Sequence, residues 1–512
     1  MNVYSVLFAT NFWYNQTLNL DRVMNQLLSG LNDEQKKAVT ISRDHHTLVL
    51  AGAGCGKTTV LTRRIAYLVG DGVSQEKILA LTFTRKAAQE MLLRIKLLEQ
   101  IDSGFALPVI TTFHGFALKL LASESGGKSN FERIGFRNRP RLLDHENRLE
   151  ILAQITDKRI RTALDVDLIR LDGLVSQYVV FPGRLVSLSP EQKMILQQVV
   201  DKYQYEKMKK SLWDFSDLLS GAVKLCEDDP GMVHKTAGVF ESVLVDEFQD
   251  TNPLQIRFLN HFVDNNCALF AVGDDDQAIY GFRGADIGPT INFTSYFKGA
   301  EIVKLQTNYR SKPFILDMAN RIFRNKSDVY RKVLVSGKYG KNDRGVKPRV
   351  CQFTDQDIMA AWIMLQAEKI YKKNRINIAD MAVLFRLNQT CDWMADWIRK
   401  KFPQKTCPQF LTIHKSKGLE YPVVFLCDLE EGVFPNYRIS SGKNNIGSVW
   451  DLIKEWYNSK KNPIECDWEE EKRLFYVGVT RAIEYLYLFS CKNKMVYGRR
   501  RRFDRSRFLR IV

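Results

Sequence analysis

Short apolar runs rich in β-branched residues alternate with helical patterns along this chain. The first set comprises "TLVLAG" (47–52), "ILALTFT" (78–84), "SVLVDE" (242–247) and "ALFAVGD" (268–274). A second set comprises "EIVKL" (301–305), "MAVLFR" (381–386), "VVFLCDL" (423–429) and "YLYLFS" (485–490). Strands that alternate with helices form parallel sheets with helical crossovers. The pattern therefore predicts an α/β protein with two parallel-sheet domains.

The strand signal fades between about residues 116 and 210. The segments 144–155 ("DHENRLEILAQI") and 189–210 ("SPEQKMILQQVVDKYQYEKMKK") have helical patterns. Ser189 is a suitable N-cap for the second helix, and Pro190 suits its first turn. We expect a helical insertion within the first α/β domain.

Composition narrows the class of protein. A chain of 512 residues is too long for one hydrophobic core, and its 45% hydrophobic and 26% charged residues are typical of globular proteins. The net charge of +17 favours a polyanionic partner. Nucleic acid is preferred over a membrane, because no apolar run approaches the length of a bilayer span. The nine cysteines lack metal-ligand or CxxC spacing, which predicts reduced thiols in an intracellular protein, cytoplasmic if bacterial.

A glycine-rich loop, "AGAGCGKT" (51–58), lies between a predicted strand and a predicted helix. Glycines allow backbone N–H groups to turn inward around phosphate oxygens, and the helix N-terminus adds partial positive charge. Lys57 would reach the β- and γ-phosphates, and the Thr58 hydroxyl would bind Mg²⁺. Ala51 replaces the usual first glycine, which matters little if its φ is negative. The alternative is a strand–helix turn that serves packing alone.

Two adjacent carboxylates, Asp246 and Glu247, follow the predicted strand in "VLVDEFQD". Asp246 is suited to the Mg²⁺ shell, and Glu247 to accepting a proton from the attacking water. The alternative is a solvated strand end. Beside a phosphate-binding loop, the pair predicts a nucleoside triphosphate hydrolase.

An ordered series of motifs resembles the superfamily 1 DNA helicases of the UvrD/Rep/PcrA type. The resemblance runs from about residue 24 to the C-terminus and rests on "LNDEQKKAV" (31–39), "AGAGCGKT" (51–58), "TFTRKAAQEM" (82–91), "TTFHGFA" (111–117), "DFSDLL" (214–219), "VDEFQDTN" (245–252), "GDDDQAIYGFRGA" (273–285), "TNYRS" (307–311), "TIHKSKGLEYP" (412–422), "EEGVFP" (430–435), "EEEKRLFYVGVTRA" (469–482) and "DRSRFL" (504–509). That family also has alanine at the position of Ala51. The resemblance implies two RecA-like P-loop domains.

The resemblance implies roles at an ATP site. The loop that holds the nucleotide would consist of Ala51, Gly52, Ala53, Gly54, Cys55, Gly56, Lys57, Thr58 and Thr59. Gln35 would bind the adenine edge, Tyr309 would stack on the ring and Glu420 would contact the ribose. Gln277 would sense the γ-phosphate, and Arg310 and Arg481 would stabilise its charge in the transition state. Cys55 is either a reactive thiol or a small residue in place of the family's serine.

The resemblance also implies contacts with single-stranded DNA. Phe83, Tyr280 and Phe282 would stack on bases, and the family usually has tryptophan at the position of Phe282. The alternative for Phe83 is core packing. Candidates for contacts with the DNA backbone are Arg283, His114, His414 and Lys417. The two histidines have an equally good alternative as structural hydrogen-bonding residues.

The implied domain plan divides the chain into five parts. These are an N-terminal extension (1–23), RecA-like domain 1A (24–115 and 211–300), helical insertion 1B (116–210), and RecA-like domain 2A with a basic C-terminal tail (301–512). Only 25 residues, 387–411, separate "AVLFR" from "TIHKSKG", which leaves room for about one helix and a turn. The family's 2B insertion is therefore expected to be absent.

The implied activity is an ATP-dependent DNA helicase and single-stranded DNA translocase with 3′ to 5′ polarity, which acts in DNA repair, replication or recombination. The expected ligands are ATP, Mg²⁺, single-stranded DNA and single-strand/duplex junctions, without a membrane partner. A protein partner or self-association is expected to assist unwinding. The alternatives are an inactive or partner-dependent single-stranded DNA-binding protein of helicase descent and an RNA helicase.

Overall fold

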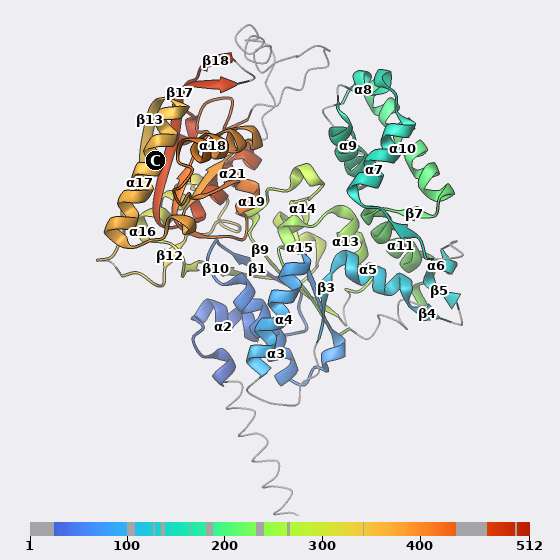
Figure 1. Ribbon diagram of the computed structural model, residues 1–512. Helices are drawn as coiled ribbons and strands as arrows, with labels where there is room; N and C mark the ends of the chain where they lie inside the picture. Colours follow the sequence, from blue (N-terminus) through green and yellow to red (C-terminus); the bar gives the residue numbers. More distant parts are fainter. Residues whose placement is uncertain are drawn as a thin grey trace, which may run out of the picture. The chain divides into compact units, whose positions relative to one another are not determined.

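The computed structural model contains two compact units, which Figure 1 colours along the sequence. It describes residues 25–99, 108–125, 128–134, 139–164, 166–180, 188–231, 240–263, 267–340, 342–436, 468–496 and 499–511. The first unit contains the described residues up to Ala51, Gly56–Asp274 and Tyr280–Leu305. The second contains Gly52–Cys55, Asp275–Ile279 and the described residues from Gln306 onward. The predicted N-terminal extension, 1–23, lies outside the described residues.

The first unit is built on a six-stranded sheet in which every pair of neighbours is parallel. In spatial order its strands are β10 (Glu301–Leu305), β1 (Thr47–Ala51), β9 (Ala268–Gly273), β8 (Ser242–Val245), β2 (Ile78–Thr82) and β3 (Val109–Thr112). Every residue of β1, β2 and β8 is buried, which explains why these strands are continuous apolar runs. The expected α/β class with parallel sheets is confirmed.

The prediction that "EIVKL" belongs to the second sheet was wrong. This segment is β10, which pairs in parallel with β1 from Thr47↔Glu301 to Ala51↔Leu305. Position along the chain does not determine which sheet a strand joins. A strand pairs with the exposed edge strand of a sheet, and that edge strand can come from a distant part of the sequence. The first unit consequently extends to Leu305.

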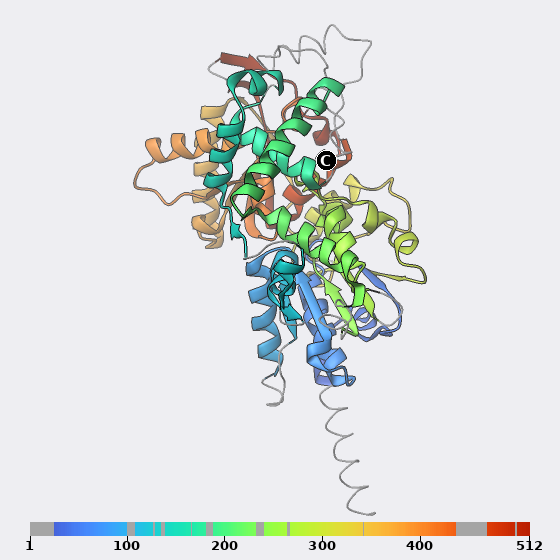
Figure 2. The same cartoon turned by 90° about the vertical axis from the view of Figure 1, so that its right-hand side faces the viewer.

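The described part of the first unit contains helices between its strands, and α7 to α10 lie in the interval in which the sequence predicts helices. The described helices are α2 (Asp33–Thr40), α3 (Lys57–Gly70), α4 (Arg85–Glu99), α5 (Phe113–Ala122), α6 (Asn130–Arg133), α7 (His145–Ile155), α8 (Lys158–Leu164), α9 (Leu168–Val180), α10 (Pro190–Lys209), α11 (Phe215–Asp228), α13 (Pro253–Leu259), α14 (Gly288–Ile291) and α15 (Phe293–Tyr296). Helices α7 to α10, coloured teal to green, lie close together (Figure 2). They share a core that includes Leu152, Leu171, Leu196 and Tyr203. Ser189 caps α10, as the sequence predicts, and it forms a reciprocal capping box with Gln192 that was not predicted.

The second unit has its own parallel sheet. Its strands run in the order β13 (Arg349–Asp355), β17 (Ala482–Val496), β16 (Tyr421–Leu426), β14 (Ala382–Phe385) and β15 (Gln409–Thr412). A further strand, β18 (Arg499–Arg502), pairs antiparallel with the end of β17. Short strands β11 (Thr307–Asn308) and β12 (Val335–Ser336) pair separately. The helices are α16 (Pro313–Ile322), α17 (Gln356–Asn374), α18 (Asn388–Lys401), α19 (Ile413–Ser416) and α21 (Trp468–Thr480).

The connection from β14 to β15 contains one helix, α18, of 14 residues. Its buried residues include Met394 and Ile398, which join the core of the second sheet beside Phe385 and Phe425. The expectation of one helix and a turn in this interval is confirmed. Among the described residues, no helix is both long enough and apolar enough to cross a membrane.

Candidate ATP site and nucleic-acid interface

The C-terminal part of the glycine loop begins helix α3 in the first unit. Gly56 is the N-cap of α3 and has φ +86°, in the left-handed region that favours glycine. A Cβ at Gly56 would lie 2.8 Å from Gln35 Nε2. Gln35 is held in place by a capping box, in which its Oε1 accepts a hydrogen bond from Asn32 N at 3.1 Å. The fold therefore places the candidate adenine-binding residue directly against the loop, where Thr58 and Thr59 form the first turn of α3.

The N-terminal end of the loop does not need the usual glycine. Ala51 is the last residue of β1 and is paired with Leu305, so its backbone is extended and a glycine is not required. Gly54 has φ +69°, and a Cβ there would lie 2.6 Å from Asn308 Nδ2. Asn308 Nδ2 in turn donates to Ala53 O at 2.6 Å, and Tyr309 N donates to Gly54 O at 3.0 Å. The contacts that Asn308 and Tyr309 make with the loop all lie within the second unit. Tyr309 is 38% exposed.

Lys57 and Glu247 form an ion pair in the first unit. Lys57 Nζ lies 3.1 Å from Glu247 Oε1, and both side chains are largely buried. Burial by itself would lower the pKa of Lys57, but the carboxylates of Glu247, Asp274 and Asp246 outweigh burial and raise that pKa. The ammonium group therefore stays charged, as a phosphate-binding lysine must.

Asp246 lies beside this pair at the carboxyl end of β8. It is 8% exposed, and its Oδ1 accepts a hydrogen bond from Glu247 N at 3.0 Å. Burial, followed by the adjacent Glu247 carboxylate, raises the pKa of Asp246 to about 7. A buried carboxyl group in this environment would be stabilised in its charged form by a cation.

The Glu247 carboxylate is held by its backbone and by a buried amide. Glu247 has φ +49°, a left-handed conformation that is uncommon for a residue other than glycine and typical of functional sites. Gln249 is fully buried, and its Nε2 donates to Glu247 Oε2. Gln249 Oε1 accepts from Asp274 N at 2.9 Å, and a Cβ at Gly273 would lie only 2.5 Å from that oxygen. The arrangement ties the orientation of Glu247 to the end of β9.

In the second unit, the two residues predicted to sense and stabilise the γ-phosphate contact each other. Arg481 Nη2 donates to Gln277 Oε1 at 3.1 Å. Arg481 is 1% exposed, and its other nitrogens donate to Val477 O at 3.1 Å and Leu419 O at 2.9 Å. A guanidinium group with several carbonyl acceptors is fixed in position and always charged.

The other candidate arginine has a different environment. Arg310 Nε donates to Glu420 Oε2 at 2.5 Å, so the residue predicted to stabilise phosphate charge is paired with the residue predicted to contact the ribose. Glu420 is half exposed, whereas Arg310 is largely buried. A nucleotide phosphate would compete with Glu420 for this guanidinium group.

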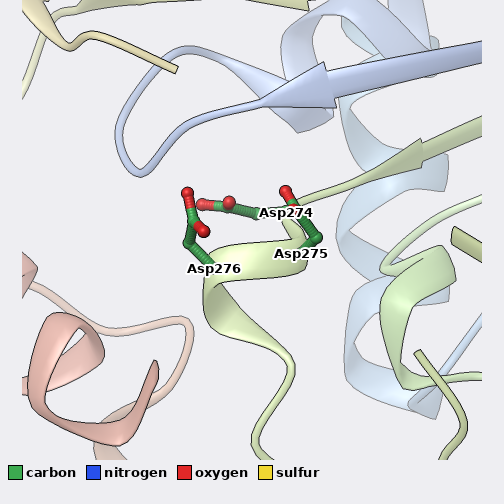
Figure 3. A group of neighbouring side chains, drawn as sticks. All are labelled: Asp274, Asp275 and Asp276. Atoms are coloured by element: carbon green, nitrogen blue, oxygen red, sulfur yellow. The ribbon is translucent and has the colours of Figure 1, made fainter. Parts of the chain in front are cut away.

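Three consecutive carboxyl groups, Asp274, Asp275 and Asp276, gather at the end of β9 (Figure 3). Their oxygens lie within 4.8 Å of one another. Lys326 and Lys332 form ion pairs with both Asp275 and Asp276, and they lower the pKa of Asp275 against the opposing effect of burial. Lysines already neutralise two of the three carboxylates, so this cluster is a structural ion network.

Three aromatic rings and a guanidinium group gather in the first unit. Phe83 and Tyr280 are stacked, with centroids 5.9 Å apart and an interplanar angle of 5°. Tyr280 and Phe282 are 6.1 Å apart, and Arg283 lies over both rings at 5.3 and 5.5 Å. Phe282 is 41% exposed, and Phe83 is partly buried against the ring of Tyr280. The sequence thus predicted residues that the fold brings together.

Comparison with known proteins follows the same division of the chain. Residues 31–298 match the model of the UvrD/REP helicase N-terminal domain. Residues 303–408 and 399–493 match the UvrD-like helicase C-terminal domain. The chain belongs to the UvrD/Rep helicase family. The relatives of this family that it resembles are named as DNA helicases.

The share of a relative's length that aligns with this chain differs between relatives. A "Probable DNA helicase" of Mycoplasma pneumoniae is 31% identical over 95% of this chain and 87% of its own length. The "ATP-dependent DNA helicase PcrA" of Bacillus subtilis is 31% identical over 72% of this chain and 49% of its own length. "DNA helicase II" of Escherichia coli is 32% identical over 71% and 49%, respectively. The chain thus spans about half the length of the PcrA and DNA helicase II relatives.

Two of the remaining candidate DNA-binding residues, His114 and Lys417, contact other residues of the chain. His114 is partly buried and packs edge-on against Phe215 at 5.8 Å, and burial lowers its pKa. Lys417 Nζ donates to Gln277 O at 2.8 Å. His414 is partly buried in α19. These contacts support a structural role for His114 and Lys417, beside any contact with DNA.

The thiol of Cys55 is 1% exposed and lies 3.7 Å from Ala53 O. Alkylation requires access to the sulfur as well as thiolate character. The burial of Cys55 therefore favours the alternative in which it is a small packing residue of the loop.

Three residues that hold candidate site residues in place were not predicted from the sequence. Gln249 orients Glu247, Asn308 holds the glycine loop, and Lys332 neutralises Asp275. Gln249 and Asn308 lie inside quoted motifs, "VDEFQDTN" and "TNYRS", so their proximity to assigned residues was the available signal. Lys332 lies outside every motif, and nothing in the sequence connects it to Asp275.

Proposed function

We propose that this UvrD/Rep family member hydrolyses ATP to move along single-stranded DNA in the 3′ to 5′ direction and separates duplex DNA ahead of it. The observation that carries this proposal is the charged set after the loop and after β8, in which Lys57 pairs with Glu247 at 3.1 Å beside the buried Asp246. The polarity rests on the family resemblance.

The same pair suggests how ATP binding prepares hydrolysis. The γ-phosphate is a competing anion for Lys57, so its arrival draws the ammonium group away from Glu247. The carboxylate of Glu247, still oriented by Gln249, then accepts a proton from the attacking water. Arg481, Gln277 and Arg310 are proposed to stabilise the charge that develops on the phosphate.

The remaining nucleotide contacts are proposed from the family pattern and from exposure. Gln35 would bind the adenine edge, Tyr309 would stack on the base with its exposed ring, and Glu420 would contact the ribose once Arg310 turns to phosphate. Backbone N–H groups from Gly52 to Thr59 would hold the phosphates.

The donor set at the end of β8 fits Mg²⁺. A hydroxyl oxygen from Thr58 and a carboxylate oxygen from Asp246 are the hard ligands that this ion prefers, together with phosphate oxygens and water. When bound, Mg²⁺ would neutralise phosphate charge. The raised pKa of the buried Asp246 supports this assignment, because a cation would stabilise the charged carboxylate.

Single-stranded DNA is proposed to stack on Phe83, Tyr280 and Phe282, with Arg283 on its backbone. Each base that stacks on an aromatic side chain contributes roughly 1–3 kcal/mol. His114, His414 and Lys417 remain further candidates for backbone contacts, and single-strand/duplex junctions are the proposed natural substrates.

The short connection through α18 bears on unwinding. We propose that translocation does not need the family's 2B insertion, because every proposed ATP and DNA residue lies outside the interval 387–411, where that insertion would stand. Duplex separation is proposed to depend on added copies of the chain or on a protein partner. A single-turnover comparison of translocation and unwinding, with titration of protein over DNA, tests this dependence.

The main experiment measures ATP hydrolysis with single-stranded DNA and RNA, and strand displacement on 3′-tailed, 5′-tailed and forked duplexes. The proposal expects stimulation by DNA and displacement from the 3′ tail. Binding of DNA without ATP turnover would identify an inactive DNA-binding protein instead. Stronger stimulation by RNA would identify an RNA helicase.

A further inference from the structure

The second unit contains a basic cavity that is lined mainly by residues near the end of the chain. The cavity has a volume of about 670 Å³ and is lined by residues of β13, β17, β18 and the segment after β18. These three strands are labelled in Figure 1. Four of its lining residues are cationic, namely Lys492, Arg502, Arg505 and Arg510, against a single carboxylate, Asp504.

Buried residues of the segment after β18 hold the wall of this cavity in place. Phe503 and Phe508 are buried, and Phe508 stacks on Phe475 with centroids 4.7 Å apart. Ser506 is also buried, and its N donates to Leu429 O at 3.0 Å. Phe503 N donates to Lys492 O at 2.8 Å. The exposed arginines therefore project from a backbone that the core fixes in place.

The basic residues of this region fall into three classes: paired, buried and without an ion pair. Arg500 pairs with Asp355, and Arg507 pairs with Glu431, so acidic side chains already neutralise both. Arg501 is only 5% exposed and is not a surface cation. By contrast, within the described part of the chain the cavity cations Lys492, Arg502, Arg505 and Arg510 form no ion pair. Their positive charge remains available to a ligand.

These cationic groups favour a ligand that contains phosphate. A guanidinium group presents a rigid fork of donors that matches phosphate oxygens, and Arg502, Arg505 and Arg510 are all exposed. Val350 and Leu509 add apolar surface to the same cavity, against which a sugar ring can pack. A cavity that combines several unpaired cations with apolar surface suits a sugar-phosphate backbone better than an isolated anion.

We propose that this cavity is a second nucleic-acid site, which binds the phosphodiester backbone through Lys492, Arg502, Arg505 and Arg510. This proposal rests on the proposed DNA helicase function and adds to it residues other than the aromatic cluster of the first unit. The site contributes affinity without base specificity, because phosphate contacts do not read sequence.

The test compares three double variants for binding to a single-stranded oligonucleotide at several salt concentrations. Arg505→Gln/Arg510→Gln removes two cavity charges. Arg500→Gln/Arg507→Gln removes the same charge from the paired class and is the matched control. Arg505→Lys/Arg510→Lys keeps the charge in the cavity. Thermal unfolding midpoints establish that all three variants are folded.

The proposal expects the slope of log K against log salt to become less steep by about 1.4 in the cavity variant, at about 0.7 per lost phosphate contact. The control and the lysine variant should retain the wild-type slope. Equal changes in the cavity variant and the control would overturn the proposal, since net charge alone would then explain them.

A pyrophosphate titration distinguishes the source of the phosphate. Tight pyrophosphate binding that is lost only in the cavity variant, with an unchanged DNA slope, would overturn the nucleic-acid assignment in favour of a small polyphosphate. Absence of DNA-stimulated ATP hydrolysis in the wild-type protein would overturn the proposed helicase function separately, because the salt slopes are measured without turnover.

Discussion

Replacement of Glu247 by glutamine tests the proposed chemistry most directly. Glutamine keeps the shape of the side chain, and its amide oxygen can still accept the hydrogen bond from Gln249 Nε2. It cannot accept a proton from water, so kcat for ATP hydrolysis should fall by about 10²- to 10⁴-fold. The same change removes the partner of Lys57, which lies 3.1 Å away.

The second effect has a predictable size. Exposed ion pairs are worth roughly 0.2–1 kcal/mol, and the side chains of Lys57 and Glu247 are only 14% and 28% exposed, which favours the upper end of that range. ATP no longer has to displace Glu247 from Lys57. Its affinity should therefore increase by up to about fivefold, since 1.4 kcal/mol corresponds to a factor of about ten.

The assay measures ATP binding with a fluorescent analogue and DNA-stimulated turnover in the steady state. Glu90→Gln is the matched control, because Glu90 pairs with Arg94 at 2.7 Å on the exposed face of α4. It removes the same charge and one ion pair and should change neither quantity. Wild-type turnover in Glu247→Gln would refute the base assignment, and weakened ATP binding would refute the competition for Lys57.

Further variants test the supporting network and the core of the second unit. Gln249→Ala should lower kcat by about 10- to 100-fold with little change in KM for ATP, because Glu247 loses its orienting donor; a change confined to KM would contradict this positioning role. Lys494→Met should destabilise the second unit by about 3–5 kcal/mol, measured by hydrogen exchange of β17, since Asp428 and Glu430 would remain buried without their cation; unchanged protection would contradict it. Burial raises the pKa of Glu430 from 4.5 to about 7. The folded protein therefore holds a proton that the unfolded chain has lost, and stability should fall as pH rises from about 4.5 to 7; Glu430→Gln should weaken this slope.

Features encoded by neighbouring residues could be predicted from the sequence. The glycine loop, the apolar runs of β1, β2, β8 and β9, and the Ser189 cap each depend on spacing within a few positions. The Lys57–Glu247–Asp246 set could also be predicted, because the carboxyl ends of parallel strands in one sheet share an edge. The candidate stacking residues Phe83 and Tyr280 could be predicted from motif order, but the geometry of their rings could not.

Other features were decided only by tertiary structure. Strand β10 joins β1 across about 250 residues of chain, Lys332 neutralises Asp275, and Gln249 connects Glu247 to the end of β9. The basic tail is the clearest case. Arg500 pairs with Asp355, its neighbour Arg501 is buried, and Arg502 is exposed. Local patterns determine the backbone conformation of each segment, but the partner of a charged or hydrogen-bonding group comes from distant segments, and only packing determines which segments meet.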